Sequence, residues 1–282
     1  MKDNDIRHQL IDDELILEYK NVGELFLKKV NEHPNKKFII VHADIKEEFT
    51  YLQFKNKIYS VISFLKNKGL KKNDKISLIF HNSSEFLVLY FAGLISGITL
   101  VPINPDMSTN EINYIIQNSN SKIIFYTNTI KTKLNLLQKT IIDREFIGIE
   151  KINELESSNK NSPEIEKNNL KDIAVIIYTS GTTGNPKGVI LSHLNLLSDA
   201  MSISKWFEFN QNTRCLCILP LFHNNGQITT LLAPLYSGGT TIIVRGKVSL
   251  FAFWFLVNQY EITWTSVMSS ILSIILSFSE ER

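Results

Sequence analysis

Short apolar runs typical of β-strands alternate with longer amphipathic runs typical of helices along most of this chain. Lys37–Val41 is one such strand-like run. A helix-like run extends from Tyr51 to about Lys68, with Thr50 placed to cap its start and Gly69 placed to end it. This alternation is typical of an α/β fold, so the sequence predicts doubly wound, mostly parallel sheets with flanking helices.

A polar segment, Leu155–Leu170, divides the expected elements into two groups, because it is rich in Asn, Ser, Lys and Glu and reads as a solvated loop. Before it we expect strands at Glu48–Thr50, Lys75–Phe80, Leu100–Ile103 and Lys122–Tyr126. We expect a helix at Glu85–Ser96, capped by Asn82, Ser83 and Ser84 and ended by Gly97, and a second from a capping-box pattern at Ser108–Glu111 to about Asn118. After it we expect strands at Ile173–Tyr178, Val189–Ser192, Cys215–Leu219, Thr240–Val244 and Ile262–Val267, and helices at Asn195–Trp206, Gln227–Tyr236, Leu250–Tyr260 and Ser269–Phe278. The sequence therefore predicts one α/β subdomain over residues 1–170 and a second over residues 171–282. The second is expected to be incomplete at its C-terminal end, because the alternation stops abruptly.

Charge and cysteine content exclude several classes of protein. Thirty Lys and Arg against 28 Asp and Glu give a net charge of +2, which argues against nucleic-acid binding. Cys215 and Cys217 are the only cysteines and can form neither a disulfide framework nor a zinc site, so we expect buried thiols and no metal centre. The tryptophans are expected in the core as well. They are Trp206, Trp254 and Trp264.

No stretch of the sequence predicts a transmembrane segment. Phe86–Val101 is too short, and Leu250–Phe278 is interrupted by polar residues such as Glu261. The N-terminus is charged and lacks the apolar region of a secretory signal. We therefore expect a cytoplasmic protein.

Groups that bind phosphate are concentrated between two of the expected strands. Residues 179–188 hold three glycines, four hydroxyl side chains and one lysine. Glycines let main-chain amides face an anion, while hydroxyls and a lysine add donors and positive charge. The candidate binding residues are Thr179, Ser180, Gly181, Thr182, Thr183, Gly184 and Lys187. A flexible connection rich in turn-forming residues is the alternative interpretation of the composition alone.

The spacing of this loop differs from two common nucleotide-binding motifs. A Walker loop has Gly, four residues and then Gly-Lys-Ser/Thr, whereas two residues separate Gly181 from Gly184 and Pro186 precedes Lys187. The G-x-G-x-x-G dinucleotide fingerprint is also missing from the loop. A kinase-like NTPase is therefore disfavoured.

The ordered string Tyr178–Val189 resembles the phosphate-binding signature of the adenylate-forming superfamily, which includes acyl-CoA synthetases, aryl-CoA ligases, luciferases and peptide-synthetase adenylation domains. The resemblance continues in Leu191–Asn195 and, more weakly, in Phe49–Tyr51 and Leu94–Pro105, so it covers about residues 20 to 275. It implies the N-terminal part of the large domain of such an enzyme. It also implies ATP, Mg²⁺ and coenzyme A as ligands, with a small carboxylic acid as substrate.

A second segment bears on the substrate. Leu219–Gly226 is similar to the Leu-Pro-x-Phe-His-x-x-Gly segment of fatty-acyl and aryl CoA ligases, whose histidine lies beside the acyl carboxylate and the α-phosphate. Peptide-synthetase domains usually carry an aspartate there, which pairs with the substrate ammonium. His223 cannot supply that charge, so the resemblance favours a fatty or aromatic acid. Taken alone, a histidine after a strand is more often a packing or capping residue.

The resemblance implies a reaction in two halves. A carboxylate attacks the α-phosphate of ATP to give an acyl adenylate and pyrophosphate, and a thiol then takes the acyl group. The loop and Lys187 would hold the pyrophosphate, with His223 near the acid. Family members are about twice as long, and the other half normally supplies a Mg²⁺-binding Glu, a ribose-binding Asp and a catalytic Lys.

Two interpretations therefore stay open. In the first, the chain is the N-terminal part of an acid–thiol ligase and is inactive alone. In the second, it is a non-catalytic remnant that binds nucleotide or pyrophosphate, or one half of a split synthetase whose partner is a separately encoded C-terminal half.

Overall fold

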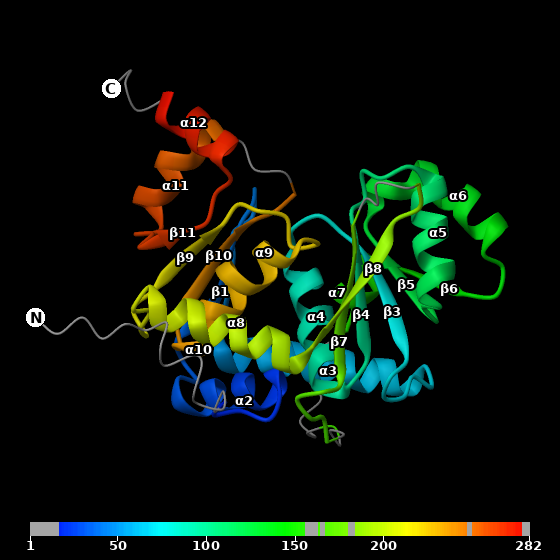
Figure 1. Ribbon diagram of the computed structural model, residues 1–282, viewed down its shortest axis with the longest axis horizontal. Coiled ribbons are helices and arrows are strands. Elements are labelled where there is room, and N and C mark those ends of the chain that lie inside the picture. The colour runs from blue at the N-terminus through cyan, green and yellow to red at the C-terminus, as the bar shows by residue number, and fades with distance from the viewer. Residues whose placement is uncertain (1–16, 156–162, 164–166, 180–183, 247–249, 278–282) are drawn as a thin grey trace, which may run out of the picture.

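In the part of the chain that the structure describes, the strands form two sheets (Figure 1). The computed structural model describes residues 17–155, 163, 167–179, 184–246 and 250–277. Within them, the six-stranded sheet has the order β6 (Glu145–Gly148), β5 (Ile123–Tyr126), β3 (Lys75–Ile79), β4 (Thr99–Ile103), β7 (Ile173–Thr179) and β8 (Lys187–Ser192). The five-stranded sheet has the order β11 (Trp264–Thr265), β9 (Arg214–Cys217), β10 (Thr240–Val244), β1 (Lys37–His42) and β2 (Glu47–Thr50). Neighbouring strands are parallel except in the pairs β1–β2 and β7–β8, which confirms the predicted fold class.

Helices cover the sheets. The α-helices are α2 (Val22–Glu32), α3 (Tyr51–Asn67), α4 (Ser84–Ser96), α5 (Thr109–Ser119), α6 (Lys131–Thr140), α7 (Ile149–Asn153), α8 (His193–Trp206), α9 (Asn224–Gln227), α10 (Ala233–Tyr236), α11 (Phe253–Gln259) and α12 (Ser269–Ser277). A π-helical turn, Ile228–Leu232, joins α9 to α10 in place of the single helix predicted there. Short 3₁₀ turns at Asn128–Ile130 and Leu250–Ala252 precede α6 and α11. None of the helices described is long and apolar enough to cross a membrane.

Local sequence signals place several of the helix ends. The Thr50 side chain accepts a hydrogen bond from the Gln53 amide and closes a capping box at the start of α3. Ser108 and Glu111 form the predicted capping box of α5. Gly97 ends α4 with a φ of 74°, a conformation that glycine adopts at little cost. These ends depend on neighbouring residues alone, which is why the sequence predicts them closely.

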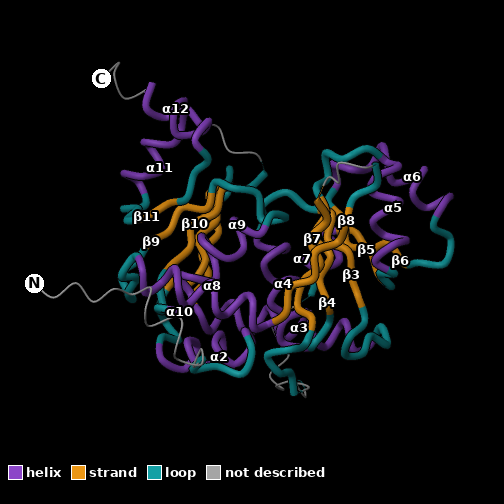
Figure 2. Tube along the Cα trace, in the orientation of Figure 1, coloured by secondary structure: helices purple, strands orange, loops and turns teal. Residues whose placement is uncertain are grey.

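The main core lies between the two sheets. All residues of α4 are buried, and the helix lies between the two groups of strands in Figure 2. A large apolar cluster joins α2, α3, α4 and α8 to both sheets. A second cluster packs α5 and α6 on the outer face of the six-stranded sheet, and a third packs α11 on the five-stranded sheet. Helices on both faces of a sheet are what a doubly wound fold requires.

The two sheets do not follow the division at residue 170 that the sequence predicted. β1 and β2 come from the N-terminal part but pair into the sheet of β9, β10 and β11. β7 and β8 follow residue 170 but complete the sheet of β3 to β6. Strand pairing joins distant segments, so the order of elements along the chain does not reveal it.

The packing predictions for cysteine and tryptophan have different outcomes. Cys215 and Cys217 are fully buried, and burial raises the pKa of both thiols. Trp254 and Trp264 are partly buried. Trp206 is 67% exposed, so its predicted place in the core was wrong. It is the last residue of α8, where the helix turns its side chain to solvent, and apolar type alone does not ensure burial.

Candidate functional site

The β7–β8 hairpin carries the ends of the predicted phosphate-binding loop. Thr179 is the last residue of β7, Lys187 is the first of β8, and the two are partners in the antiparallel register. Both are exposed. The central predicted residues of the loop lie outside the described residues: Ser180, Gly181, Thr182 and Thr183. Gly184 follows them with a φ of 118° and open space around it. A hydroxyl and an ammonium therefore belong to opposite strands where this loop begins and ends.

Tyr178 joins the hairpin to helix α5, which packs on the same sheet. A Cβ at Gly188 would approach the Tyr178 ring to 3.1 Å and the Ile176 side chain to 2.9 Å, so the glycine lets the ring lie close over β8. The Tyr178 hydroxyl donates a 2.6 Å hydrogen bond to Oδ1 of Asn118 in α5. Burial raises the pKa of this hydroxyl, which therefore keeps its proton near neutral pH. The aromatic residue of the signature thus acts as a structural anchor here.

His223 stands at the start of α9, on the segment that follows β9. Its amide donates to the Pro220 carbonyl at 3.1 Å, and its carbonyl accepts from the Gln227 amide at 3.3 Å. The side chain is exposed, with its ring centroid 4.7 Å from that of Phe222. Partial desolvation by the surrounding protein lowers the pKa of His223, so the ring is neutral near pH 7. A neutral imidazole offers one hydrogen-bond donor and one acceptor.

The hairpin and His223 emerge on the same edge of the molecule, although they belong to different sheets. β7 is parallel to β4, and β4 is parallel to β3. Asn82, just beyond β3, hydrogen-bonds to Leu219 and Leu221 beyond β9 and to Gly246 beyond β10. The carboxyl ends of strands from both sheets therefore meet. This edge is where open α/β sheets bind ligands.

Asn82 is the residue at this edge that sequence reasoning missed. The sequence suggested Asn82, Ser83 and Ser84 together as a helix cap. In the structure only the Ser83 side chain has that role, accepting from the Phe86 amide, while Asn82 reaches the other sheet. No local signal distinguishes the two uses, because both place a short polar side chain before a helix.

The donor set at this edge fits phosphate better than a metal ion. Thr179 and Lys187 carry a hydroxyl and an ammonium, both donors to phosphate oxygens. In the ranges that the structure describes, no three His, Cys, Asp or Glu side chains are grouped closely enough to hold a metal ion. Nothing in the described donor set points to Mg²⁺ or to coenzyme A.

Comparisons with known proteins identify the family of this chain. A family model described as AMP-binding enzyme matches residues 26–282. Oxalate–CoA ligase of Arabidopsis thaliana is 28% identical over 218 residues, which cover 74% of this chain and 42% of that protein. Gramicidin S synthase 2 of Brevibacillus brevis is 26% identical over 265 residues, 93% of this chain and 6% of that protein.

Solved structures share the fold. A putative long-chain-fatty-acid CoA ligase from Rhodopseudomonas palustris has a TM-score of 0.82 at 18% identity, covering 93% of this chain and 66% of that one. The chain spans about half the length of the curated CoA ligases that it matches.

Proposed function

The chain belongs to the AMP-binding enzyme family, and from that premise we propose that it carries the phosphate- and acid-binding part of an ATP-dependent acid–thiol ligase. In the proposed reaction, a carboxylate attacks the α-phosphate of ATP, which gives an acyl adenylate and releases pyrophosphate. The thiol of coenzyme A then takes the acyl group, and AMP is released. We propose a fatty or an aromatic acid as the substrate. CoA ligases among its relatives support this class of reaction.

The observation that carries the proposal is the pairing of Thr179 with Lys187 at the two ends of the signature loop. ATP supplies an α-phosphorus open to attack and a pyrophosphate leaving group. In the proposal, Lys187 places its ammonium against the departing phosphate oxygens and Thr179 donates its hydroxyl to them. Positioning and charge neutralisation contribute most of the catalysis in such reactions. The remaining loop residues, Ser180 to Gly184, are proposed to add main-chain and hydroxyl donors.

His223 is proposed to orient the acid. The lowered pKa keeps its ring neutral, so it can donate a hydrogen bond to a carboxylate oxygen without forming an ion pair. It offers no negative charge to a substrate ammonium, which is the basis for preferring fatty or aromatic acids to amino acids. Amino acids, which the resemblance associates with peptide-synthetase domains, belong in any substrate panel as the contrasting class.

We also propose that these 282 residues alone bind nucleotide phosphates without completing the reaction. The Glu, Asp and Lys that the family resemblance implies for Mg²⁺, ribose and catalysis have no motif counterpart in this sequence. The binding of Mg²⁺ and of coenzyme A is therefore proposed on the basis of the family alone. A purely binding role, with no turnover at all, is the alternative function.

Pyrophosphate binding to single-site variants tests the proposal. Calorimetric titration of the chain with sodium pyrophosphate is expected to show binding that Lys187→Ala weakens about tenfold or more, since hydrogen bonds to charged groups are strong. Lys171→Ala is the matched control, because Lys171 is also exposed and precedes the opposite end of β7. Equal affinities for Lys187→Ala and the unmodified chain would refute the assigned role.

A further inference from the structure

Asn82 reaches from one sheet to the segment of the other sheet that leads to His223. Its side chain is buried, at 4% exposure. Nδ2 donates to the Leu219 carbonyl at 3.0 Å, and Oδ1 accepts from the Leu221 amide at 2.8 Å. One side-chain amide thus holds the main chain on both sides of Pro220, three residues before His223.

Gln227 holds the same segment from the other side. It is fully buried, and its Nε2 donates to the Leu221 carbonyl at 2.8 Å. Both main-chain groups of Leu221 are therefore satisfied by side-chain amides, from Asn82 and Gln227. A shift of this segment would leave buried polar groups without hydrogen-bond partners, which is energetically unfavourable. The position of Leu221 is thereby fixed two residues before His223.

The turn that contains His223 is also closely packed. A Cβ at Gly226 would lie 2.5 Å from the Pro220 carbonyl oxygen, so glycine is needed for α9 to approach the turn this closely. The His223 amide donates to that same carbonyl. The main chain around His223 has little freedom to move while Leu221 stays in place.

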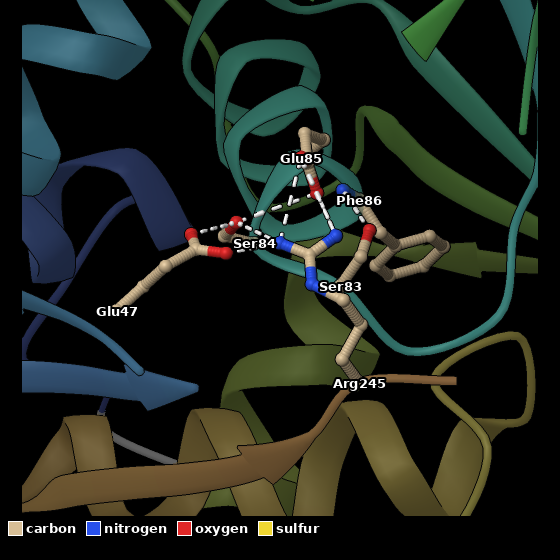
Figure 3. A network of polar contacts seen from close by, with 6 residues as sticks. All are labelled: Glu47, Ser83, Ser84, Glu85, Phe86 and Arg245. Atoms are coloured by element: carbon tan, nitrogen blue, oxygen red, sulfur yellow. Dashed lines mark hydrogen bonds and ion pairs between the residues drawn. The ribbon is translucent and has the colours of Figure 1, made fainter. Parts of the chain in front are cut away.

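An ion-pair cluster fixes the start of α4, two residues after Asn82. Arg245, just after β10, pairs with Glu47 of β2 and, at 3.0 Å, with Glu85 of α4 (Figure 3). Ser84 donates to Glu47 at 2.7 Å, and the Gly246 amide donates to the Asn82 carbonyl at 2.9 Å. The start of α4 is therefore fixed to the end of β10, and Asn82 is the residue that extends this junction to the His223 segment.

We propose that Asn82, together with Gln227, is a positioning residue for His223, holding the main chain of Leu221 so that the imidazole faces the ligand-binding edge. That the position of His223 serves acid activation rests on the proposed function. The contacts that hold His223 in this position do not depend on it. Neither residue need touch the substrate.

The test compares two buried asparagines. Asn168 is buried at 8% exposure, and its Nδ2 donates to the carbonyls of Leu94 and Ile95, so Asn168→Ala also removes buried amide hydrogen bonds. In the ¹H–¹³C NMR spectrum, the His223 ring signal is assigned as the one lost in His223→Gln. Asn82→Ala is expected to shift this signal, move its titration midpoint, and speed hydrogen exchange of the Leu221 amide about tenfold or more. Asn168→Ala is expected to leave all three unchanged at a comparable loss of stability.

An Asn82→Ala variant that is destabilised like Asn168→Ala but keeps the native His223 signal and Leu221 exchange would overturn the proposal. Should Asn82→Ala fail to fold, Gln227→Met decides, because it keeps the side-chain volume and removes only the amide. The same signal changes are expected there, and their absence would equally overturn the proposal. Sodium octanoate and benzoate, added separately, test the proposed function. If neither acid shifts the His223 signal, acid binding beside His223 is refuted, while the positioning of His223 by Asn82 is not.

Discussion

His193 makes folding stability depend on pH in a way that can be worked out from its surroundings. It is 1% exposed at the start of α8, and its Nδ1 accepts a hydrogen bond from the Val22 amide at the start of α2, at 3.3 Å. Burial lowers the pKa of His193 to about 4 from its ordinary 6.5. The charge of Asp172 opposes this shift and that of Lys72 adds to it, but burial is the largest cause. The folded protein therefore holds this ring neutral.

The magnitude follows from the difference between the two pKa values of His193. Between pH 6.5 and pH 4 the unfolded chain binds a proton that the folded chain does not, so stability falls as the pH falls. One pKa unit corresponds to about 1.4 kcal/mol, so this ring removes about 2 kcal/mol between pH 7 and pH 5. The loss grows to about 3 kcal/mol near pH 4.

Urea unfolding followed by tryptophan fluorescence measures this loss at pH 7, 6 and 5. The comparison variant is His193→Asn, whose Oδ1 can accept the Val22 hydrogen bond but does not titrate. Between pH 7 and 5, the unmodified chain is expected to lose about 2 kcal/mol more than the variant. Parallel pH dependences of the two proteins would refute the assignment, since the carboxylates that both share would then explain all of the change.

Two further perturbations test the packing around α4. In urea unfolding, Gly97→Ala is expected to lower the free energy of unfolding by at least about 1 kcal/mol more than Gly69→Ala does. Both glycines have φ near 75°, but a Cβ would lie 2.5 Å from the Asn168 Oδ1 at Gly97 and in open space at Gly69. Arg245→Met leaves the buried Glu85 carboxylate without its ion-pair partner, so we expect the free energy of unfolding to fall by about 3 kcal/mol. A fall of less than about 1 kcal/mol would show that the cluster contributes no more than a solvent-exposed ion pair.

The sequence predicts those parts of the fold that depend on neighbouring residues. The caps at Thr50 and Ser108 and the helix end at Gly97 agree with the structure, because each needs only a turn of chain to form. Strand order is different. β1 pairs with β10 about two hundred residues later. The pairing uses main-chain hydrogen bonds that nearly any residue type can form, so the sequence does not specify the partner strand. For this reason the predicted boundary at residue 170 does not separate the sheets.

The candidate site divides in the same way. The loop from Thr179 to Lys187 could be singled out from the sequence as a candidate, because its glycines, hydroxyls and lysine are contiguous, and its phosphate-binding role stays a prediction. Asn82 could not, since the main-chain groups that it holds lie 137 and 139 residues away and any side chain can stand at those positions. Gln227 reads as an ordinary helix residue until its contact with Leu221 is seen.

A crystal structure of the chain with a bound non-hydrolysable ATP analogue would show where the protein holds the nucleotide phosphates. We expect the β- and γ-phosphates at the end of the β7–β8 hairpin, with the Lys187 ammonium and the Thr179 hydroxyl about 3 Å from their oxygens. Phosphates bound at another edge of the sheets, or an empty hairpin with Lys187 paired to a carboxylate of the protein, would contradict this expectation.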